Sequence, residues 1–473
     1  MSTEQLGSIT SVRELPDGRV LLNDGARRRL LLMDTTLKTV EVVLDSLTEV
    51  ENSYGTRPGG LIAYRADSSL FVDAGSYAML VIDPNGKVAR VRSVPRVEDA
   101  SRFVGPDAVR SGVDGRGRVV YRIGARPGPP LVPPPRDVPY FPPEPDSAFI
   151  VSIDLDTRKI DTLGSIRIPK SASTIRRTAD GRFNFYEVVN PMPSTDEWAV
   201  LSTGVVAFVR GVDYRIDYRH PDGTWTSSPK LPFDWQRVTE EDKQHMIDSV
   251  KAENRRQTMG SYVSSMIRWV NQYGKAYPAG FTVPEGFRLQ NGLSRTWKLP
   301  PGVQFPPNYI YACGPNETPT MTNPPPAEQR PPGVAPPAPN PNAQGPRGGF
   351  PGAMQGTPSC IPSPVVVTGG NAPPPPTLRD VGVMPASDLP DYRPPFSSGS
   401  VRADADGNVW IRTTPSKPTP GGPVYDIVSS AGEMTDRLQL PPGYSIAGFG
   451  RGKVVYLSMR DPAGIHLARV RLR

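Results

Sequence analysis

The sequence predicts an all-β fold, a six-bladed β-propeller with a helical and Pro-rich insertion between blades four and five. Two observations lead to this prediction. Residues 401–440 contain four short apolar runs with turns at Asp406-Gly407 and Gly432, and four antiparallel strands in roughly 40 residues make one propeller blade. The pattern then recurs along the chain, with Asp-Gly or Asn-Gly between apolar runs as the hairpin signal.

Six blades can be delimited along the chain. The first three lie within residues 8–163, the fourth covers 197–226, and the last two lie within 396–472. A blade alone cannot bury both of its faces, so each must stack on its neighbours. We expect this inter-blade core to contain Leu21, Phe71, Val120, Phe208, Trp410 and Tyr456.

The sixth blade is incomplete in the C-terminal part of the chain. Only three strands are visible there, at 446–449, 454–457 and 465–472. An unfinished blade leaves an open sheet edge, which proteins avoid. We therefore expect residues 3–9 to supply the fourth strand and to close the ring.

A large insertion separates blades four and five. Thr239 can cap a helix, and acidic residues fill the turn that follows it, where the helix dipole favours negative charge. After Gly260, an apolar stripe at 262–270 indicates an amphipathic helix that packs onto the propeller or, alternatively, receives a partner helix. The Pro-rich stretch at 324–349 lacks the N–H groups that a sheet needs. The predicted organisation is blades one to four in 1–230, a helical insertion in 231–299, a Pro-rich low-complexity arm in 300–395, and blades five and six in 396–473.

The composition bears on partners and location. A net charge of +7 over 473 residues is a mild excess, and no block of five or more Lys and Arg residues occurs, so we expect no nucleic-acid partner. No apolar run reaches the roughly 18 residues that a transmembrane helix needs. The N-terminal residues have neither the basic nor the apolar region of a signal peptide. The protein is therefore either cytoplasmic, or its export signal is missing from this chain.

The blade motifs resemble those of six-bladed β-propellers of the NHL and TolB-like kind, and more closely those of uncharacterised bacterial propeller proteins predicted to be exported. The resemblance covers 8–230 and 395–473 and rests on LPDGRVLLND…RRRLLLMD, DEWAVLSTGVVAFVRGVDYRIDYRHPDG and ADADGNVWIR…YDIVSSAGE. It implies the fold but no particular activity, because such propellers host binding and hydrolysis alike. In the NHL pattern an Asp that ends the second strand is braced by a later Arg. Asp24 and Arg29 match this pattern, whereas Ala78 stands where Asp73 would need its Arg.

The long loops are expected to share one face of the ring. In a propeller, the loops between strands two and three and the connections between blades lie on one face, and the two remaining kinds of turn lie on the other. The long segments, which belong to the first kind, are 125–145, 171–195, 230–396 and 414–423. Insertions confined to one face of a repeat protein often mark its binding face. We therefore expect this loop-rich face to bind a ligand or a partner.

Arginines that end second strands should project near the loop-rich face. They are Arg122, Arg210, Arg412 and Arg460. Guanidinium groups in a partly desolvated ring bind carboxylate or phosphate well, because the planar fork is bidentate and permanently charged. We predict that these four residues bind an anionic ligand. The alternative is that they brace neighbouring blades by pairing with Asp73, Asp217, Asp426 or Asp461.

Catalytic motifs are not apparent in the sequence. His220, His245 and His466 do not have metal-ligand spacing to one another or to a cysteine. No nucleophile elbow, zinc-protease motif or phosphate-binding loop occurs. We expect a non-enzymatic, monomeric binding or scaffold protein without cofactor or metal, which holds an anionic small molecule, a glycan or a protein partner. The alternative is a propeller hydrolase of the lactonase or glycan-lyase type with a metal in the central channel.

The two cysteines, Cys313 and Cys360, flank the longest Pro-rich run and lie in turn-like contexts. A bond between them would close a loop of roughly 48 residues and stabilise the insertion by on the order of 4 kcal/mol in the chain-entropy model. Disulfides persist in oxidising compartments. We therefore predict a disulfide and a periplasmic or extracellular location. The alternative is two free thiols in a cytoplasmic protein.

Overall fold

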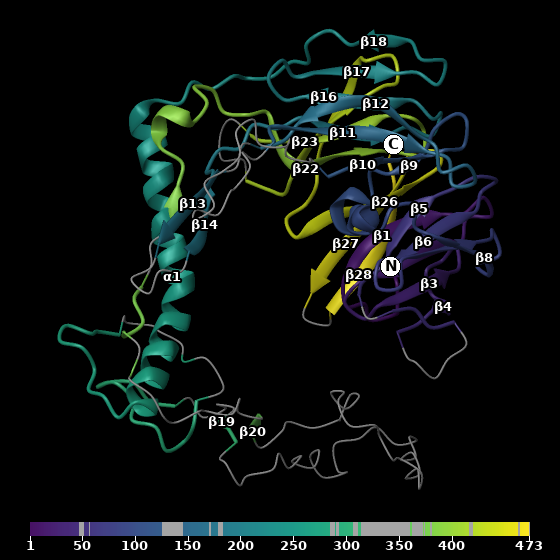
Figure 1. The fold of residues 1–473 in the computed structure, drawn as a ribbon. Coiled ribbons are helices and arrows are strands. Elements are labelled where there is room, and N and C mark those ends of the chain that lie inside the picture. Colours follow the sequence, from purple (N-terminus) through teal and green to yellow (C-terminus); the bar gives the residue numbers. More distant parts are fainter. Residues whose placement is uncertain are drawn as a thin grey trace, which may run out of the picture. The chain divides into compact units, whose positions relative to one another are not determined.

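The structure is a computed structural model. It describes residues 1–46, 52–55, 57–124, 145–169, 172–177, 183–283, 289, 293–305, 311–313, 360–361, 372, 374–378, 381–415, 420–461 and 464–472. These residues form six β-sheets arranged as propeller blades (Figure 1), which confirms the predicted fold class. The chain divides into two compact units: one comprises Met1–Ile247 and Gly382–Arg473 and contains the blades, and the other comprises Asp248–Val381. The Pro-rich stretch at 324–349 lies outside the described residues.

The strands of each blade are antiparallel and follow one another in chain order. Successive side chains of a strand point to opposite faces, so every sheet offers apolar residues to the blades on both sides. The strands are, for blade one, β1 (Ile9–Glu14), β2 (Val20–Asp24), β3 (Arg29–Met33) and β4 (Val40–Leu44); for blade two, β5 (Gly60–Ala63), β6 (Ser69–Asp73), β7 (Ala78–Ile82) and β8 (Val88–Ser93); for blade three, β9 (Gly112–Val113), β10 (Val119–Arg122), β11 (Ser147–Ile153) and β12 (Ile160–Arg167); for blade four, β15 (Glu197–Val200), β16 (Val206–Arg210), β17 (Arg215–Arg219) and β18 (Trp225–Ser227); for blade five, β22 (Phe396–Ala403), β23 (Val409–Thr413), β24 (Val424–Val428) and β25 (Met434–Gln439); and for blade six, β26 (Tyr444–Gly450), β27 (Val454–Asp461) and β28 (Gly464–Arg471).

The innermost strand of blade three is short. Two 3₁₀ helices, η1 (Val97–Phe103) and η2 (Gly105–Asp107), precede it, and β9 holds only two residues. The amide of Ala108 donates to the carbonyl oxygen of Gly105, and the amide of Ser111 donates to that of Asp107. These local bonds withdraw residues 108–111 from the ladder, although the apolar character of Ala108-Val109 suits a strand.

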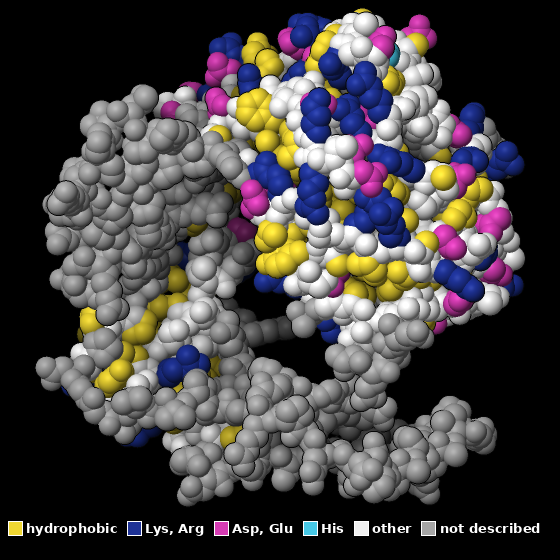
Figure 2. Space-filling view, turned by 45° about the vertical axis from the view of Figure 1, so that its right-hand side comes forward, with side chains coloured by type: hydrophobic (Ala, Val, Ile, Leu, Met, Phe, Trp, Pro, Cys, Tyr) yellow, Lys and Arg dark blue, Asp and Glu magenta, His cyan; other side chains and the backbone are white. Residues whose placement is uncertain are grey.

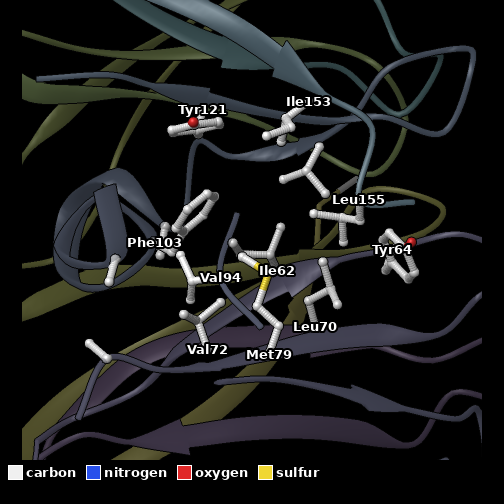
Figure 3. Packing of buried hydrophobic residues seen from close by; sticks show 14 of the residues in the cluster. Ile62, Tyr64, Leu70, Val72, Met79, Val94, Phe103, Tyr121, Ile153 and Leu155 are labelled. Carbon is white, nitrogen blue, oxygen red and sulfur yellow. The ribbon is translucent and has the colours of Figure 1, made fainter. Parts of the chain in front are cut away.

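Apolar clusters fill the spaces between neighbouring blades. Leu21 and Phe71 share the cluster between blades one and two, and Val120 and Phe208 share the one between blades three and four. Figure 3 shows the corresponding cluster between blades two and three, where Met79 of β7 lies close to Ile62 of β5. The six residues expected from the sequence are all buried in such clusters. Each large side chain buried in this way contributes about 1.5–3 kcal/mol.

The N-terminal segment pairs with the last strand. Leu6 forms an antiparallel bridge with Ile465, and the amide of Ser2 donates to the carbonyl oxygen of Leu467 at 2.8 Å. The Leu6 side chain is 3% exposed within the cluster between blades six and one. The carboxylate of Asp24 accepts hydrogen bonds from the next amide of the segment, that of Gly7, at 2.9 Å. The first and last residues of the ring are thus joined by backbone bonds, apolar contact and a buried carboxylate.

One long helix, α1 (Glu240–Gln272), opens the insertion. Thr239 caps it: its hydroxyl accepts a hydrogen bond from the amide of Asp242 at 3.1 Å, and the Asp242 carboxylate accepts one from the Thr239 amide at 3.0 Å. Lys243, almost fully buried, donates to Asp391 at 2.9 Å. The helix continues through Gly260, where the sequence indicated a break. No helix within the described residues is both long and apolar enough to cross a membrane.

The apolar stripe of α1 is buried by the insertion itself. Val263 and Ile267 pack with Leu289 and Leu293, which follow the helix in the chain. Residues of the insertion thus account for the burial of the stripe, which we expected the propeller surface to cover. The remaining elements are the sheet of β13 (Ala172–Arg177), β14 (Phe183–Val189) and β21 (Gly382–Val383), the parallel pair β19 (Tyr311–Ala312) and β20 (Cys360–Ile361), and the 3₁₀ helix η4 (Ala386–Asp388).

Closure by the N-terminal segment generates a stability prediction. Leu6→Ala removes a buried side chain from the cluster between blades six and one, so we expect the free energy of unfolding to fall by about 2–5 kcal/mol. Guanidinium chloride unfolding followed by tryptophan fluorescence measures this loss. Thr3→Ala, whose exposed hydroxyl only donates to the Lys38 carbonyl oxygen, is the control and should unfold like the unmodified protein. Equal stability of the two variants would contradict a structural role for this segment.

Candidate functional site

A cavity of about 350 Å³ lies where the innermost strands of the six blades converge. Small residues such as Ala63, Ala403 and Ala447 form much of its wall, which leaves the space that larger side chains would fill. Glycine also lets blade six approach blade one closely, since a Cβ on Gly448 would lie 2.5 Å from the carbonyl oxygen of Val12. A volume of this size is at the lower end of the ~300–1,000 Å³ range of small-molecule pockets.

The axial cavity lies toward the face that carries the short turns. Its lining includes Asp67, Ser202 and Arg451, which belong to the turns after the innermost strands. Glu197 and Phe396, the first residues of β15 and β22, do not line it. The cavity is thus at the opposite end of the ring from the loop-rich face that the sequence singled out. Binding at the loop-rich face stays a prediction.

The acidic residues of the lining are engaged with other groups. Glu14 accepts a hydrogen bond from the Tyr456 hydroxyl and lies 3.5 Å from Arg469. Asp404 accepts hydrogen bonds from its own turn and from the indole N–H of Trp410 at 2.9 Å. Asp67 lies 3.6 Å from Arg451. The charged lining residues are thus three arginines and three acidic residues: Arg13, Arg402, Arg451, Glu14, Asp67 and Asp404.

Two of the lining arginines make no ion pair with a described residue. Arg13 of β1 donates to the carbonyl oxygen of Ser68 and the hydroxyl of Ser69 in blade two. Burial lowers the pKa of Arg13 to about 10, although the charge of Asp67 acts against that shift. Arg402 of β22 donates through Nη1 to the carbonyl oxygen of Ile446 in blade six at 2.7 Å. Both side chains thus bridge to the next blade with part of the guanidinium and have donors left.

Two other guanidinium groups act on Arg402, although one of them, that of Arg110, is itself paired with Glu197 at 2.7 Å. Burial lowers the pKa of Arg402, and the neighbouring guanidinium groups of Arg110 and Arg412 lower it further, while Tyr425 acts in the opposite direction. The strand pairing explains part of this arrangement: Arg412 stands opposite Tyr425, on the face of blade five that also bears Arg402. A buried cation without a counterion is costly. This position therefore suits an anion.

On the surface of the blades, basic and acidic side chains lie next to one another. Lys and Arg side chains lie close together over the blades in Figure 2, and acidic side chains lie between them. Exposed ion pairs of this kind, for example Arg65 with Asp154 at 3.5 Å, have their charges balanced and contribute little energy. Arg402 differs because it is partly buried and has no carboxylate within ion-pair distance among the described residues.

Two of the four arginines predicted to bind an anion are held in ion pairs. Arg122 lies 2.7 Å from Asp107. Arg210 lies 2.8 Å from Asp217 in its own blade and 3.0 Å from Asp196. The pair of Arg210 with Asp217 matches the alternative in which these arginines brace the blades. These ion pairs occupy the donors that a ligand would need.

The other two predicted arginines are exposed. Neither Arg412 nor Arg460 makes an ion pair with a described residue, and of the two it is Arg412 whose charge acts on Arg402. Sequence reasoning missed Arg402 because it considered only the ends of second strands. The available signal was an arginine within the innermost strand of blade five, between Val401 and Ala403.

Two of the three histidines contact side chains near them in the chain. The His220 ring lies 2.8 Å from the Thr226 hydroxyl, and the His466 ring lies 3.2 Å from the Asp461 carboxylate. No group of three or more His, Cys, Asp or Glu side chains within the described part of the chain could hold a metal ion.

Comparisons with known proteins find only distant likenesses. No protein-family model matches the chain, and no curated protein matches it. Among solved structures the chain is similar to a streptogramin B lyase (8% identity, TM-score 0.30, covering 100% of this chain and 85% of that chain). It is also similar to a virginiamycin B lyase from Staphylococcus aureus (12%, 0.25, 49% and 73%) and an auxiliary nutrient binding protein from Bacteroides ovatus (7%, 0.25, 48% and 48%). Likenesses of this size carry no argument about activity.

The ion pairs of Arg210 generate a prediction with a defined pH dependence. Arg210→Ala leaves Asp196 and Asp217 without their partner, so we expect a loss of about 1–3 kcal/mol in the free energy of unfolding at pH 7. Burial alone would raise the pKa of Asp217, but hydrogen bonds from Arg210 and Ser227 and the charge of Arg210 hold it below its ordinary value of 3.8. The stabilisation is thus present above pH 3.8 and is lost as the pH falls through the lowered pKa.

Urea unfolding at pH 7 and pH 3 measures the effect. The difference between the unmodified protein and Arg210→Ala should shrink at pH 3. Arg460→Ala removes an exposed arginine from the corresponding strand end of blade six and serves as the control with no expected change. Unaltered stability of Arg210→Ala at pH 7 would show that these ion pairs do not brace the ring.

Proposed function

We propose that this propeller is a non-enzymatic binding protein that holds an anionic ligand in its axial cavity, with Arg402 as the anchoring residue. One observation carries the proposal: a partly buried guanidinium lines the cavity and has no carboxylate within ion-pair distance among the described residues. The ligand class is an organic carboxylate or a phosphate, because both match the planar donor fork of arginine.

The donors of Arg402 support this role. A guanidinium carries five N–H donors, and one hydrogen bond to the protein, to the Ile446 carbonyl oxygen, is present. That bond fixes the orientation of the side chain between blades five and six. A ligand anion would then accept the remaining donors and supply the missing countercharge.

The proposal also concerns the protein family to which the chain is related and the cellular location of the protein. The Asp24–Arg29 pair, whose charged atoms lie 3.8 Å apart, supports kinship with NHL-like propellers because it matches their brace. We also propose that the loop-rich face recruits a glycan or a protein partner and that the protein works in the periplasm or outside the cell. The last point depends on the pairing of Cys313 with Cys360.

Anion binding can be tested with citrate and inorganic phosphate as probes on the full chain. We expect the melting temperature to rise with the concentration of at least one probe, because a ligand that binds the folded state stabilises it. In Arg402→Gln the dissociation constant from titration calorimetry should rise at least tenfold. Arg116→Gln, an exposed arginine of the β9–β10 turn that lines no part of the axial cavity, should bind like the unmodified protein. Equal affinities of Arg402→Gln and Arg116→Gln would overturn the proposal.

The proposed disulfide has a direct chemical test. Strands β19 and β20 pair in parallel with Tyr311 opposite Cys360, which supports proximity of the two cysteine segments. Intact mass under non-reducing conditions should therefore be lower by two protons than after reduction, and alkylation without reductant should leave both thiols unmodified. Two alkylated thiols in protein recovered from its native compartment would remove the basis for an oxidising location.

A further inference from the structure

Hydroxyl groups line the axial cavity beside its arginines. Ser11 and Tyr64 are 6% and 9% exposed, and both line the cavity. Neither hydroxyl makes a hydrogen bond with a described residue, whereas Ser111, also in the lining, donates to the Asp107 carbonyl oxygen. Both hydroxyl oxygens are open to the cavity space, since neither is among the fully buried polar atoms without a partner. Ser11 and Tyr64 therefore have hydrogen-bonding capacity that the protein does not use.

The hydroxyls and the anchoring arginine come from different sides of the ring. Ser11 lies on β1 in blade one, Tyr64 follows β5 in blade two, and Arg402 lies on β22 in blade five. In a six-bladed ring, blade five is opposite blade two. Figure 3 shows Tyr64 at the edge of the cluster between blades two and three. A molecule that contacts Arg402 and these hydroxyls must therefore extend across the axis.

The rest of the wall suits the carbon skeleton of such a molecule. Leu61, Ala63, Ala108 and Ala447 present apolar surface to the cavity. A wall that alternates apolar groups with a few convergent polar ones is typical of sites that bind small organic ligands. A lone phosphate ion would occupy the neighbourhood of Arg402 and would leave the opposite wall without contacts.

We infer that the ligand of this site is a hydroxylated monocarboxylic acid, the chemical class that includes the sugar acids. Its carboxylate accepts hydrogen bonds from Arg402, and its hydroxyl groups exchange hydrogen bonds with Ser11 and Tyr64. The inference rests on the proposed function, since it assumes that Arg402 binds an anion. It adds the class of the ligand and its orientation across the axis.

Two six-carbon acids, D-gluconate and hexanoate, test the inference by titration calorimetry. They carry the same charged group and differ in hydroxyl groups. We expect gluconate to bind the unmodified protein at least tenfold more tightly than hexanoate. The double variant Ser11→Ala/Tyr64→Phe should lose this preference and retain its affinity for hexanoate, while Arg402→Gln should lose both ligands. Tyr77→Phe, which alters an exposed tyrosine outside the cavity, is the matched control and should keep the preference.

The outcomes separate the two claims. Equal affinities of the unmodified protein for gluconate and hexanoate would overturn the inference and leave the proposed anion site in place. A preference that survives in Ser11→Ala/Tyr64→Phe would overturn the assigned orientation. Failure of both acids to bind would overturn the inference, and the titrations with citrate and inorganic phosphate would decide the proposed function separately. The affinities of the unmodified protein for gluconate and hexanoate test the ligand class even if the double variant does not fold.

Discussion

The requirement that every sheet be packed on both faces determines this structure. A single four-stranded blade has apolar residues on both sides, and each of them needs a neighbour. A ring satisfies the requirement only if its last blade meets its first. The bridge between Leu6 and Ile465 and the burial of Leu6 beside blade one fulfil this condition with residues from opposite ends of the chain. The stability of each blade therefore depends on the whole ring.

The same geometry creates the candidate site. When six sheets converge on an axis, their innermost strands have little room for side chains, and residues such as Ala63, Ala447 and Gly448 occupy the wall. The cavity that remains is walled by the six blades, so a charge within it is less well solvated than one on the surface. Arg402 is placed there by its position on β22 and is held by the carbonyl oxygen of the next blade. The anion that we propose would compensate this charge.

The sequence predicts the ring more readily than the site. Turn signals and apolar runs are local, so Asp406-Gly407 and Trp410 could be assigned to a blade from a few neighbouring residues. The site depends on which innermost residues face the axis and on which arginines find carboxylates, and both are set by residues far apart in the chain. Arg122 and Arg210 looked equivalent to Arg412 in the sequence, but the packed blades bring Asp107 and Asp217 to them and not to Arg412.

A crystal structure of the protein grown with selenate tests the central claim most directly. Selenate is an oxyanion whose anomalous scattering identifies its position independently of the model. The account predicts an anomalous peak in the axial cavity within hydrogen-bonding distance of the Arg402 guanidinium, about 2.7–3.2 Å. A carboxylate of the chain paired with Arg402, or selenate bound only to exposed arginines of the surface, would contradict it.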